Sequence, residues 1–259
     1  MATPVWPKYI FAQIFRYMAE EVKPYEEKGS KKEQVSQMFN GIARYYDFLN
    51  RLLSAGIDRV WRRKAIAELK SAQPKLILDV ATGTADVALE TAKQLSPDQI
   101  IGIDISTKIL DIGRAKISKR GLDTLIELKE GDSENLPFAD NTFDAITVAF
   151  GVRNFENLEQ GLQEMYRVLK PEGKLVVLEF SKPQIFPFKQ LYNFYFRNIL
   201  PAIGKITSRD PKAYRYLYES VQAFPDVGKF TGILGKVGYK SNQCKPLTLG
   251  ICSCYTGIR

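Results

Sequence analysis

Carboxylates and small residues recur where short apolar runs of this chain end, and together they could bind a polar ligand. The first run begins at Leu76, carries Asp79 and leads into a loop of small residues that includes Gly83 and Thr84. Small side chains let a ligand approach the backbone, and the free N–H groups that open a helix bind polar groups. Because apolar residues resume at helical spacing from Val87, the stretch predicts a strand, a tight turn and a helix that bind a nucleotide-like cofactor.

The number of glycines in this loop separates two classes of nucleotide cofactor. A dinucleotide site requires G-x-G-x-x-G after its first strand, whereas Gly83 is the only glycine between Asp79 and Gly102. The stretch instead resembles the first motif of S-adenosylmethionine-dependent methyltransferases, in which an acidic residue at a strand end precedes alternating small residues. That resemblance implies S-adenosylmethionine as the cofactor and methyl donor.

Two further carboxylates follow apolar runs in the same way. Asp104 lies at the end of the second run, Asp132 follows the third, and Ser106 is placed to cap the helix after Asp104. Ligands of doubly wound sheets bind at the carboxyl ends of the strands, so we expect Asp79, Asp104 and Asp132 at one edge. Asp104 could accept hydrogen bonds from ribose hydroxyls. Asp132 could accept from the adenine amino group, beside the backbone of Ser133.

The elements that position these residues alternate between buried strands and amphipathic helices. The sequence therefore predicts an α/β fold with a doubly wound, Rossmann-like sheet in one domain. We expect the first five strands at residues 76–80, 100–105, 125–128, 143–148 and 174–180, and a helix that begins near Leu158 and ends near Lys170.

Composition narrows the chemistry. The chain has 259 residues, a formal net charge of +8 and no histidine, which excludes Ser-His-Asp and Cys-His catalysis. Its three cysteines cluster near the end without C-x-x-C spacing, so they predict neither a metal site nor a disulfide framework, and a reducing cytoplasm is the default. The positive charge favours anionic partners such as acidic lipid head groups or nucleic acid.

The first 34 residues differ from the rest. Residues 1–17 are rich in aromatic side chains but too few to span a bilayer; they are either an interfacial anchor or a disordered tail. Residues 20–34 are dominated by lysine and glutamate and are interpreted as a solvated linker. We therefore divide the chain into a tail and linker at 1–34 and a methyltransferase domain at 35–259.

Two longer signatures resemble the quinone C-methyltransferases, the family of demethylmenaquinone methyltransferase and its ubiquinone-pathway relatives. The first runs from Tyr46-Asp47-Phe48-Leu49-Asn50 through Ser54 to Trp61, and the second is Arg167-Val168-Leu169-Lys170-Pro171-Glu172-Gly173-Lys174-Leu175-Val176-Val177-Leu178-Glu179-Phe180-Ser181. The resemblance covers residues 35 to 259. It implies seven strands in the order 3-2-1-4-5-7-6, an antiparallel last strand at Thr248 to Thr256, and cofactor contacts from Thr84, Asp104, Asp132 and Ser133.

The chain departs from this family at several positions of the two motifs. The departures are Leu49 for a usual Met, Asp58 for a usual His, Glu172 for a usual Gly, and Thr82 and Ala85 for usual glycines. None removes a carboxylate that faces the cofactor. Ala85, however, predicts a less close approach of the loop backbone to the ligand.

The resemblance also implies the acceptor, a reduced polyprenyl quinone. An aromatic helical insert at about residues 183–225 could hold its lipophilic tail, cover the sheet as a lid, or do both. A ring carbon of the quinol becomes nucleophilic when the neighbouring phenol is ionised, and this chemistry requires no metal. We interpret Arg153, which stays protonated, as stabilising the phenolate, while Tyr46, Asp47 or water takes the proton.

Several alternatives stay open at this point. The sequence distinguishes neither naphthoquinol from benzoquinol acceptors nor a monomer from a homodimer. A nucleic-acid methyltransferase is disfavoured because the segment after the fourth strand, Ala149 to Asn154, lacks a base-flipping motif. A non-catalytic scaffold at the membrane is disfavoured by the intact Asp104 and Asp132. We expect a cytoplasmic enzyme that associates peripherally with the inner face of the membrane.

Overall fold

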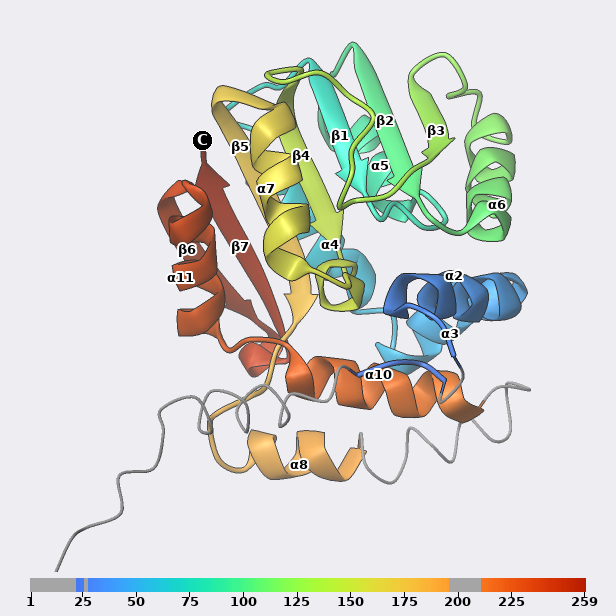
Figure 1. The fold of residues 1–259 in the computed structure, drawn as a ribbon, viewed down its shortest axis with the longest axis vertical. Helices are drawn as coiled ribbons and strands as arrows, with labels where there is room; N and C mark the ends of the chain where they lie inside the picture. Colours follow the sequence, from blue (N-terminus) through green and yellow to red (C-terminus); the bar gives the residue numbers. More distant parts are fainter. Residues whose placement is uncertain (1–21, 26–27, 196–210) are drawn as a thin grey trace, which may run out of the picture.

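One seven-stranded sheet organises the molecule (Figure 1). The computed structural model describes residues 22–25, 28–195 and 211–259, so the aromatic stretch predicted at 1–17 lies outside the described residues. The strand order is β3-β2-β1-β4-β5-β7-β6, as expected. The strands are β1 (Leu76–Val80), β2 (Gln99–Asp104), β3 (Ile126–Glu130), β4 (Phe143–Ala149), β5 (Leu169–Phe180), β6 (Lys240–Leu247) and β7 (Cys252–Ile258).

The strand directions follow the prediction, and two strands begin four or more residues away from their predicted starts. Strands β1 to β5 pair in parallel, and β7 is antiparallel to both β5 and β6. Strand β7 begins at Cys252 instead of Thr248, because Thr248–Gly250 form a 3₁₀ turn in which Leu249 has a φ of 58°. Strand β5 begins at Leu169, which pairs with Phe143, so the preceding helix ends at Val168.

Two hydrophobic cores lie on the two faces of the sheet, because successive strand residues point to opposite faces. Leu78 and Ile146 belong to the first core, and the adjacent Ile77 and Ala145 belong to the second. Helices α7 (Leu158–Val168) and α11 (Val227–Val237) cover the first, and α4 (Asp58–Ala67), α5 (Asp86–Gln94) and α6 (Thr107–Ser118) cover the second. Figure 1 shows α7 and α11 in front of the sheet and α4 and α5 behind it.

A separate group of helices lies beyond the carboxyl ends of the parallel strands (Figure 1). It comprises α2 (Lys31–Ile42), α3 (Tyr46–Leu53), α8 (Phe188–Phe194) and α10 (Pro211–Ala223). Ser30 and Glu33 form a capping box at the start of α2, so the linker predicted to extend to residue 34 is wrong for 31–34. The lysines of this segment were expected to be exposed to solvent. Lys31, however, is buried, and its Nζ donates to the carbonyls of Arg153 and Phe155.

The capping of α6 also differs in its chemistry from the prediction. Ser106 occupies the N-cap position, yet its side chain makes no capping hydrogen bond. Asn40 of α2 supplies the acceptor instead: its Oδ1 accepts from the Lys108 N–H at 3.2 Å and from the Ser106 hydroxyl at 2.9 Å. Helix α2 is thereby fixed to the loop that carries Asp104. Among the helices that the structure describes, none combines the length and apolar character needed to cross a bilayer.

Candidate active site

The loop after β1 has the tight turn that its small residues predicted. Ala81, Gly83 and Ala85 all have positive φ, at 52°, 57° and 63°, a conformation that small residues tolerate best. Asp79, which we expected at the ligand edge, is buried instead, and its carboxylate accepts from the hydroxyls of Thr82 at 2.6 Å and Thr147 at 2.7 Å. Burial raises the Asp79 pKa to about 6. Asp79 therefore holds the loop against β4.

A first pocket brings together three of the predicted cofactor residues, Asp104, Asp132 and Ser133. The other residues that line it are Lys32, Val35, Phe39, Ala81, Ile103, Ile105, Gly131, Glu134, Gly151, Asn154, Phe155 and Glu156. Each Asp104 oxygen accepts one N–H at 2.9 Å, from Ser106 and from Gly83. A carboxylate oxygen has two lone pairs, so Asp104 can still accept from two ribose hydroxyls. The residues present therefore fit the adenosine part of S-adenosylmethionine.

Asp132 is already in contact with the N-terminal helix. Its Oδ1 accepts from the Glu134 N–H at 2.9 Å, and Lys32 of α2 forms an ion pair with its Oδ2 at 2.5 Å. Lys32 also lies 3.7 Å from a Glu134 carboxylate oxygen. Helix α2 thus covers the end of the pocket that carries Asp132, where the sequence predicts the adenine ring, a contribution that the linker interpretation of this segment missed.

Gly83 and Thr84, two further predicted cofactor residues, contact different parts of the protein. A Cβ at Gly83 would lie 3.7 Å from the Tyr46 ring, so Gly83 stands where α3 meets the cofactor loop. The Thr84 side chain is buried; its hydroxyl donates to Asp47 at 2.6 Å and accepts from Lys116 at 2.8 Å. Thr84 is not among the side chains that line the pocket, so its direct cofactor contact stays a prediction.

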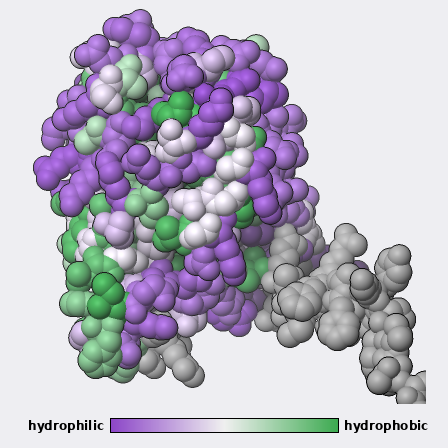
Figure 2. Space-filling view, turned by 90° about the vertical axis from the view of Figure 1, so that its left-hand side faces the viewer, coloured by the Kyte–Doolittle hydropathy of each residue, from purple (hydrophilic) through white to green (hydrophobic). Residues whose placement is uncertain are grey.

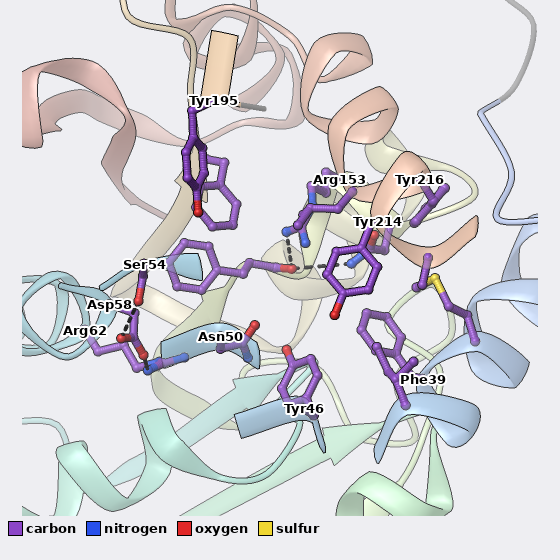
Figure 3. Close-up of a pocket in the computed structure, with 17 residues that line it drawn as sticks. Phe39, Tyr46, Asn50, Ser54, Asp58, Arg62, Arg153, Tyr195, Tyr214 and Tyr216 are labelled. Atoms are coloured by element: carbon purple, nitrogen blue, oxygen red, sulfur yellow. Dashed lines mark hydrogen bonds and ion pairs between the residues drawn. The ribbon is translucent and has the colours of Figure 1, made fainter. Parts of the chain in front are cut away.

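A second pocket adjoins the first and is lined by three groups of side chains (Figure 3). One group follows every fourth residue along α3 and α4: Tyr46, Asn50, Ser54, Asp58 and Arg62. A second comes from the segment after β4 and from β5: Phe150, Arg153, Asn154 and Phe180. The third comes from α2 and the insert: Met38, Phe39, Ile42, Tyr195, Ala213, Tyr214, Tyr216 and Leu217. Phe39 and Asn154 line both pockets.

Arg153 is the cation at the centre of this pocket (Figure 3). Its guanidinium donates to the Phe150 carbonyl and, at 2.8 Å, to Glu179, whose side chain is fully buried. Burial raises the pKa of Glu179, and the charge of Arg153 opposes that rise. The Arg153 Nε is buried and has no hydrogen-bond partner among the described residues. A buried donor without a partner is costly, so this N–H fits an acceptor oxygen of a ligand.

The other two predicted catalytic residues, Tyr46 and Asp47, lie in different surroundings. Tyr46 lines the pocket, and burial raises its pKa, which disfavours the phenolate that a tyrosine base needs. Asp47 does not line the pocket, because its carboxylate pairs with Lys116 at 2.6 Å and accepts from Thr84. The structure thus brings Tyr46 and Arg153 together and leaves Asp47 on the outer side of α3. The sequence analysis did not assign Asn50, Ser54, Asp58 and Arg62 to the pocket; the only signal for them was the four-residue spacing of polar side chains from 46 to 62.

The fold and the first pocket define a class, the S-adenosylmethionine-dependent methyltransferases. A methyltransferase of this class from Aquifex aeolicus is similar over 82% of this chain and 97% of its own, with a TM-score of 0.58 and 18% identity. A second, from Thermotoga maritima and described as a possible histamine N-methyltransferase, covers 86% and 98%, with a TM-score of 0.61 and 18% identity. At such identities the likeness shows the fold alone.

Sequence comparison narrows the class to a family. The model of the ubiE/COQ5 methyltransferase family matches residues 27–259, and the chain belongs to that family. It is 49% identical over 243 residues to the demethylmenaquinone methyltransferase of Bacteroides fragilis, covering 94% of this chain and 99% of the relative. It is also 49% identical over 228 residues to a ubiquinone/menaquinone biosynthesis C-methyltransferase of Geotalea daltonii, covering 88% and 97%. The predicted fold, family and methyl donor are confirmed, and the protein is an S-adenosylmethionine-dependent methyltransferase.

Proposed function

We propose that this enzyme methylates a ring carbon of a reduced polyprenyl quinone, converting a demethylmenaquinol to a menaquinol. The relatives' names support a quinol acceptor, and the second pocket has the aromatic walls that such a ring requires. The observation that carries the proposal is the Arg153 side chain, which lines that pocket and whose buried Nε–H has no hydrogen-bond partner among the described residues. It is a donor placed for the oxygen of a phenolate.

The chemical problem is to ionise the acceptor. S-adenosylmethionine supplies an electrophilic methyl group, which an ionised quinol can attack through the ring carbon next to the oxygen. A phenol with a pKa near 10 is only about 0.1% ionised at pH 7, and lowering that pKa by about three units is worth roughly 4 kcal/mol. Arg153 supplies this stabilisation from a buried, weakly solvated position. It remains protonated throughout, so it holds the phenolate and does not remove the proton.

Positioning contributes the remainder. Tyr46 packs against Gly83 of the cofactor loop and lines the acceptor pocket, so it holds the acceptor ring close to the methyl donor. Phe39 lines both pockets and helps to exclude water between them. Bringing two reactants together in line removes much of the entropic barrier of a bimolecular step.

The isoprenoid tail could bind to an exposed apolar surface formed by α8 and the residues just before it. Ile185, Phe186, Leu191 and Phe194 are between 59% and 76% exposed, and Tyr195, at the end of α8, lines the acceptor pocket. Figure 2 shows hydrophobic side chains gathered at the lower end of the molecule, where α8 lies in Figure 1. Burying one isoprene unit is worth roughly 4 kcal/mol as an upper bound, at about 0.8 kcal/mol per CH₂.

The same surface supports transient contact with a bilayer. An apolar helix at the mouth of the pocket, together with a net charge of +8, suits the anionic inner face of a membrane. A long tail can stay in the lipid while its first units lie against α8. These features support the proposal that the enzyme visits the membrane surface from the cytoplasmic side.

Paired acceptors test this proposal. Transfer of a labelled methyl group should be measured with a reduced demethylmenaquinone and with the corresponding reduced benzoquinone, each with a short prenyl tail. We expect methylation of the naphthoquinol, with the label on the ring carbon. Faster methylation of the benzoquinol would move the enzyme to the ubiquinone pathway, and no methylation of either quinol would refute the proposal. Co-flotation with vesicles containing anionic lipid tests the membrane contact separately.

A further inference from the structure

A buried carboxylate in the acceptor pocket is not used by the mechanism above. Asp58, at the start of α4, is 3% exposed and lines the pocket. Its Oδ1 accepts from the Ser54 hydroxyl at 2.7 Å, and its Oδ2 pairs with Arg62. Figure 3 shows these three side chains on the wall of the pocket that also carries Asn50 and Tyr46.

Asp58 belongs to a chain of ion pairs that has more negative than positive groups. Arg62 also approaches Asp86 at 3.6 Å, Lys116 pairs with Asp86 at 2.6 Å, and Lys116 pairs with Asp47 at 2.6 Å. The connected groups are thus three carboxylates and two cations. Asp58 is the carboxylate of this network that lines the pocket.

We propose that Asp58 is the proton acceptor of the methylation, an inference that rests on the quinol acceptor proposed above. The chain contains no histidine, Asp47 lies outside the pocket, and burial raises the pKa of Tyr46. Asp58 is the only carboxylate among the described side chains that line this pocket. The geometry gives the two walls different tasks: Arg153 holds the oxygen and Asp58 receives its proton.

The step balances without an additional reactant. The acceptor hydroxyl gives its proton to the Asp58 carboxylate, directly or through the Ser54 hydroxyl. The carbon–methyl bond then forms with an electron pair of the ring as the sulfur–methyl bond of the donor breaks, which leaves a neutral thioether. The ring carbon loses its hydrogen as a proton to solvent, the proton on Asp58 returns to the oxygen, and the net product is one proton.

The electrostatic surroundings of Asp58 involve several other elements. Its partner Arg62 on α4 also acts on ionisable groups of four other elements: Tyr46 on α3, Asp79 on β1, Asp86 on α5 and Cys252 on β7. The other cation that lines the pocket is Arg153, which follows β4. The charge of Arg62 is therefore shared and not reserved for Asp58.

The pH dependence of an Asp58→Asn variant tests the proposal. In the wild type, kcat/KM should vary little from about pH 7 to about pH 9. In Asp58→Asn it should fall by about 100-fold or more at neutral pH, the usual contribution of a general base. It should then rise about tenfold per pH unit, because only acceptor already ionised in solution can react. Asp58→His should restore much of the rate, with an acidic limb near its ordinary pKa of about 6.5.

Controls separate this role from a structural one. S-adenosylmethionine affinity, measured by calorimetry, should change less than about twofold, and Asp111→Asn, on the exposed side of α6, should behave as the wild type. If Asp58→Asn fails to fold, Asp58→Asn/Arg62→Gln removes both charges of the pair, a change that is often tolerated, and should show the same pH slope.

Two outcomes would overturn the proposal in different ways. An active variant with a wild-type pH profile would remove Asp58 from proton transfer and leave the quinol function intact. A wild-type enzyme that methylates neither quinol would overturn the function and, with it, this role of Asp58.

Discussion

The buried Asp79 makes the stability of this enzyme depend on pH in a direction opposite to that of most carboxylates. Its carboxylate is 1% exposed and is held by two threonine hydroxyls, with no cation in direct contact among the described residues. Burial is the main cause that raises its pKa from 3.8 to about 6. The folded state therefore binds this proton more tightly than the unfolded state does, and stability must fall as the proton leaves.

The sign and size of the effect follow from these two pKa values. Well below the unfolded-state pKa of 3.8 the group is protonated in both states and does not change the free energy of unfolding. As the pH rises through about 6, the folded state pays the full difference, about 3 kcal/mol at 1.36 kcal/mol per pKa unit. About 2 kcal/mol of this loss falls between about pH 4.5 and about pH 7.5. Asp79→Asn cannot ionise, so it should lack this part of the pH dependence.

Urea unfolding of the wild type and Asp79→Asn at these two pH values provides the measurement. The change in the free energy of unfolding with pH should be about 2 kcal/mol more unfavourable in the wild type, whatever constant offset the amide introduces. Thr147→Val removes a hydrogen bond to the ionised carboxylate and should steepen the loss. Asp111→Asn, in which the original side chain is 70% exposed, is the control. The same pH dependence in wild type and Asp79→Asn would refute this reasoning.

The remaining predictions concern the two pockets. Asp104→Ala and Asp132→Ala should each weaken S-adenosylmethionine binding by about 1–3 kcal/mol without unfolding the protein; equal affinity in calorimetry would contradict the pocket assignment. Arg153→Met should lower turnover far more than cofactor affinity and regain part of it at higher pH, and full turnover at neutral pH would exclude the phenolate role. Glu179→Ala leaves the buried guanidinium unpaired and should cost about 3–5 kcal/mol in urea unfolding, whereas a loss below about 1 kcal/mol would show that Arg153 finds another partner. Phe194→Ser should raise KM for prenylated acceptors but not for a tail-less quinol, and equal changes would show that α8 covers the ring.

Most of the sheet could be predicted because the central parallel strands β1, β2 and β4 are covered on both faces. Continuous apolar runs such as the one through Ile77 and Leu78 have few other solutions in a chain of this length. The errors lie where side chains from distant segments decide the outcome. Lys31 looks solvated in sequence, yet its ammonium group donates to carbonyls after β4. Asn40, far from Ser106 in sequence, supplies the cap of α6.

In the site, too, the residues placed by local sequence were predictable, and those placed by contacts with other segments were not. Asp104 and Asp132 were predictable because a strand end fixes where a carboxylate lies. Asp47 and Asp79 were not, because each is withdrawn from the ligand by partners elsewhere in the chain: Lys116 for the first, Thr82 and Thr147 for the second. Glu179 belongs to the second family signature, but its burial and its pairing with Arg153 could not be predicted because they depend on the packing around β5.

The shared walls of the two pockets explain why the N-terminal helices must be well ordered when the enzyme works. Phe39 of α2 and Asn154 line both pockets, and Lys32 reaches Asp132 from the same helix. The ion pairs that begin at Asp58 in the acceptor wall end at Asp47, which accepts from Thr84 in the cofactor loop. On the proposed assignment of the two pockets, movement of α2 or α3 would disturb the methyl donor and the acceptor together, so direct transfer between them would depend on helices that lie outside the sheet.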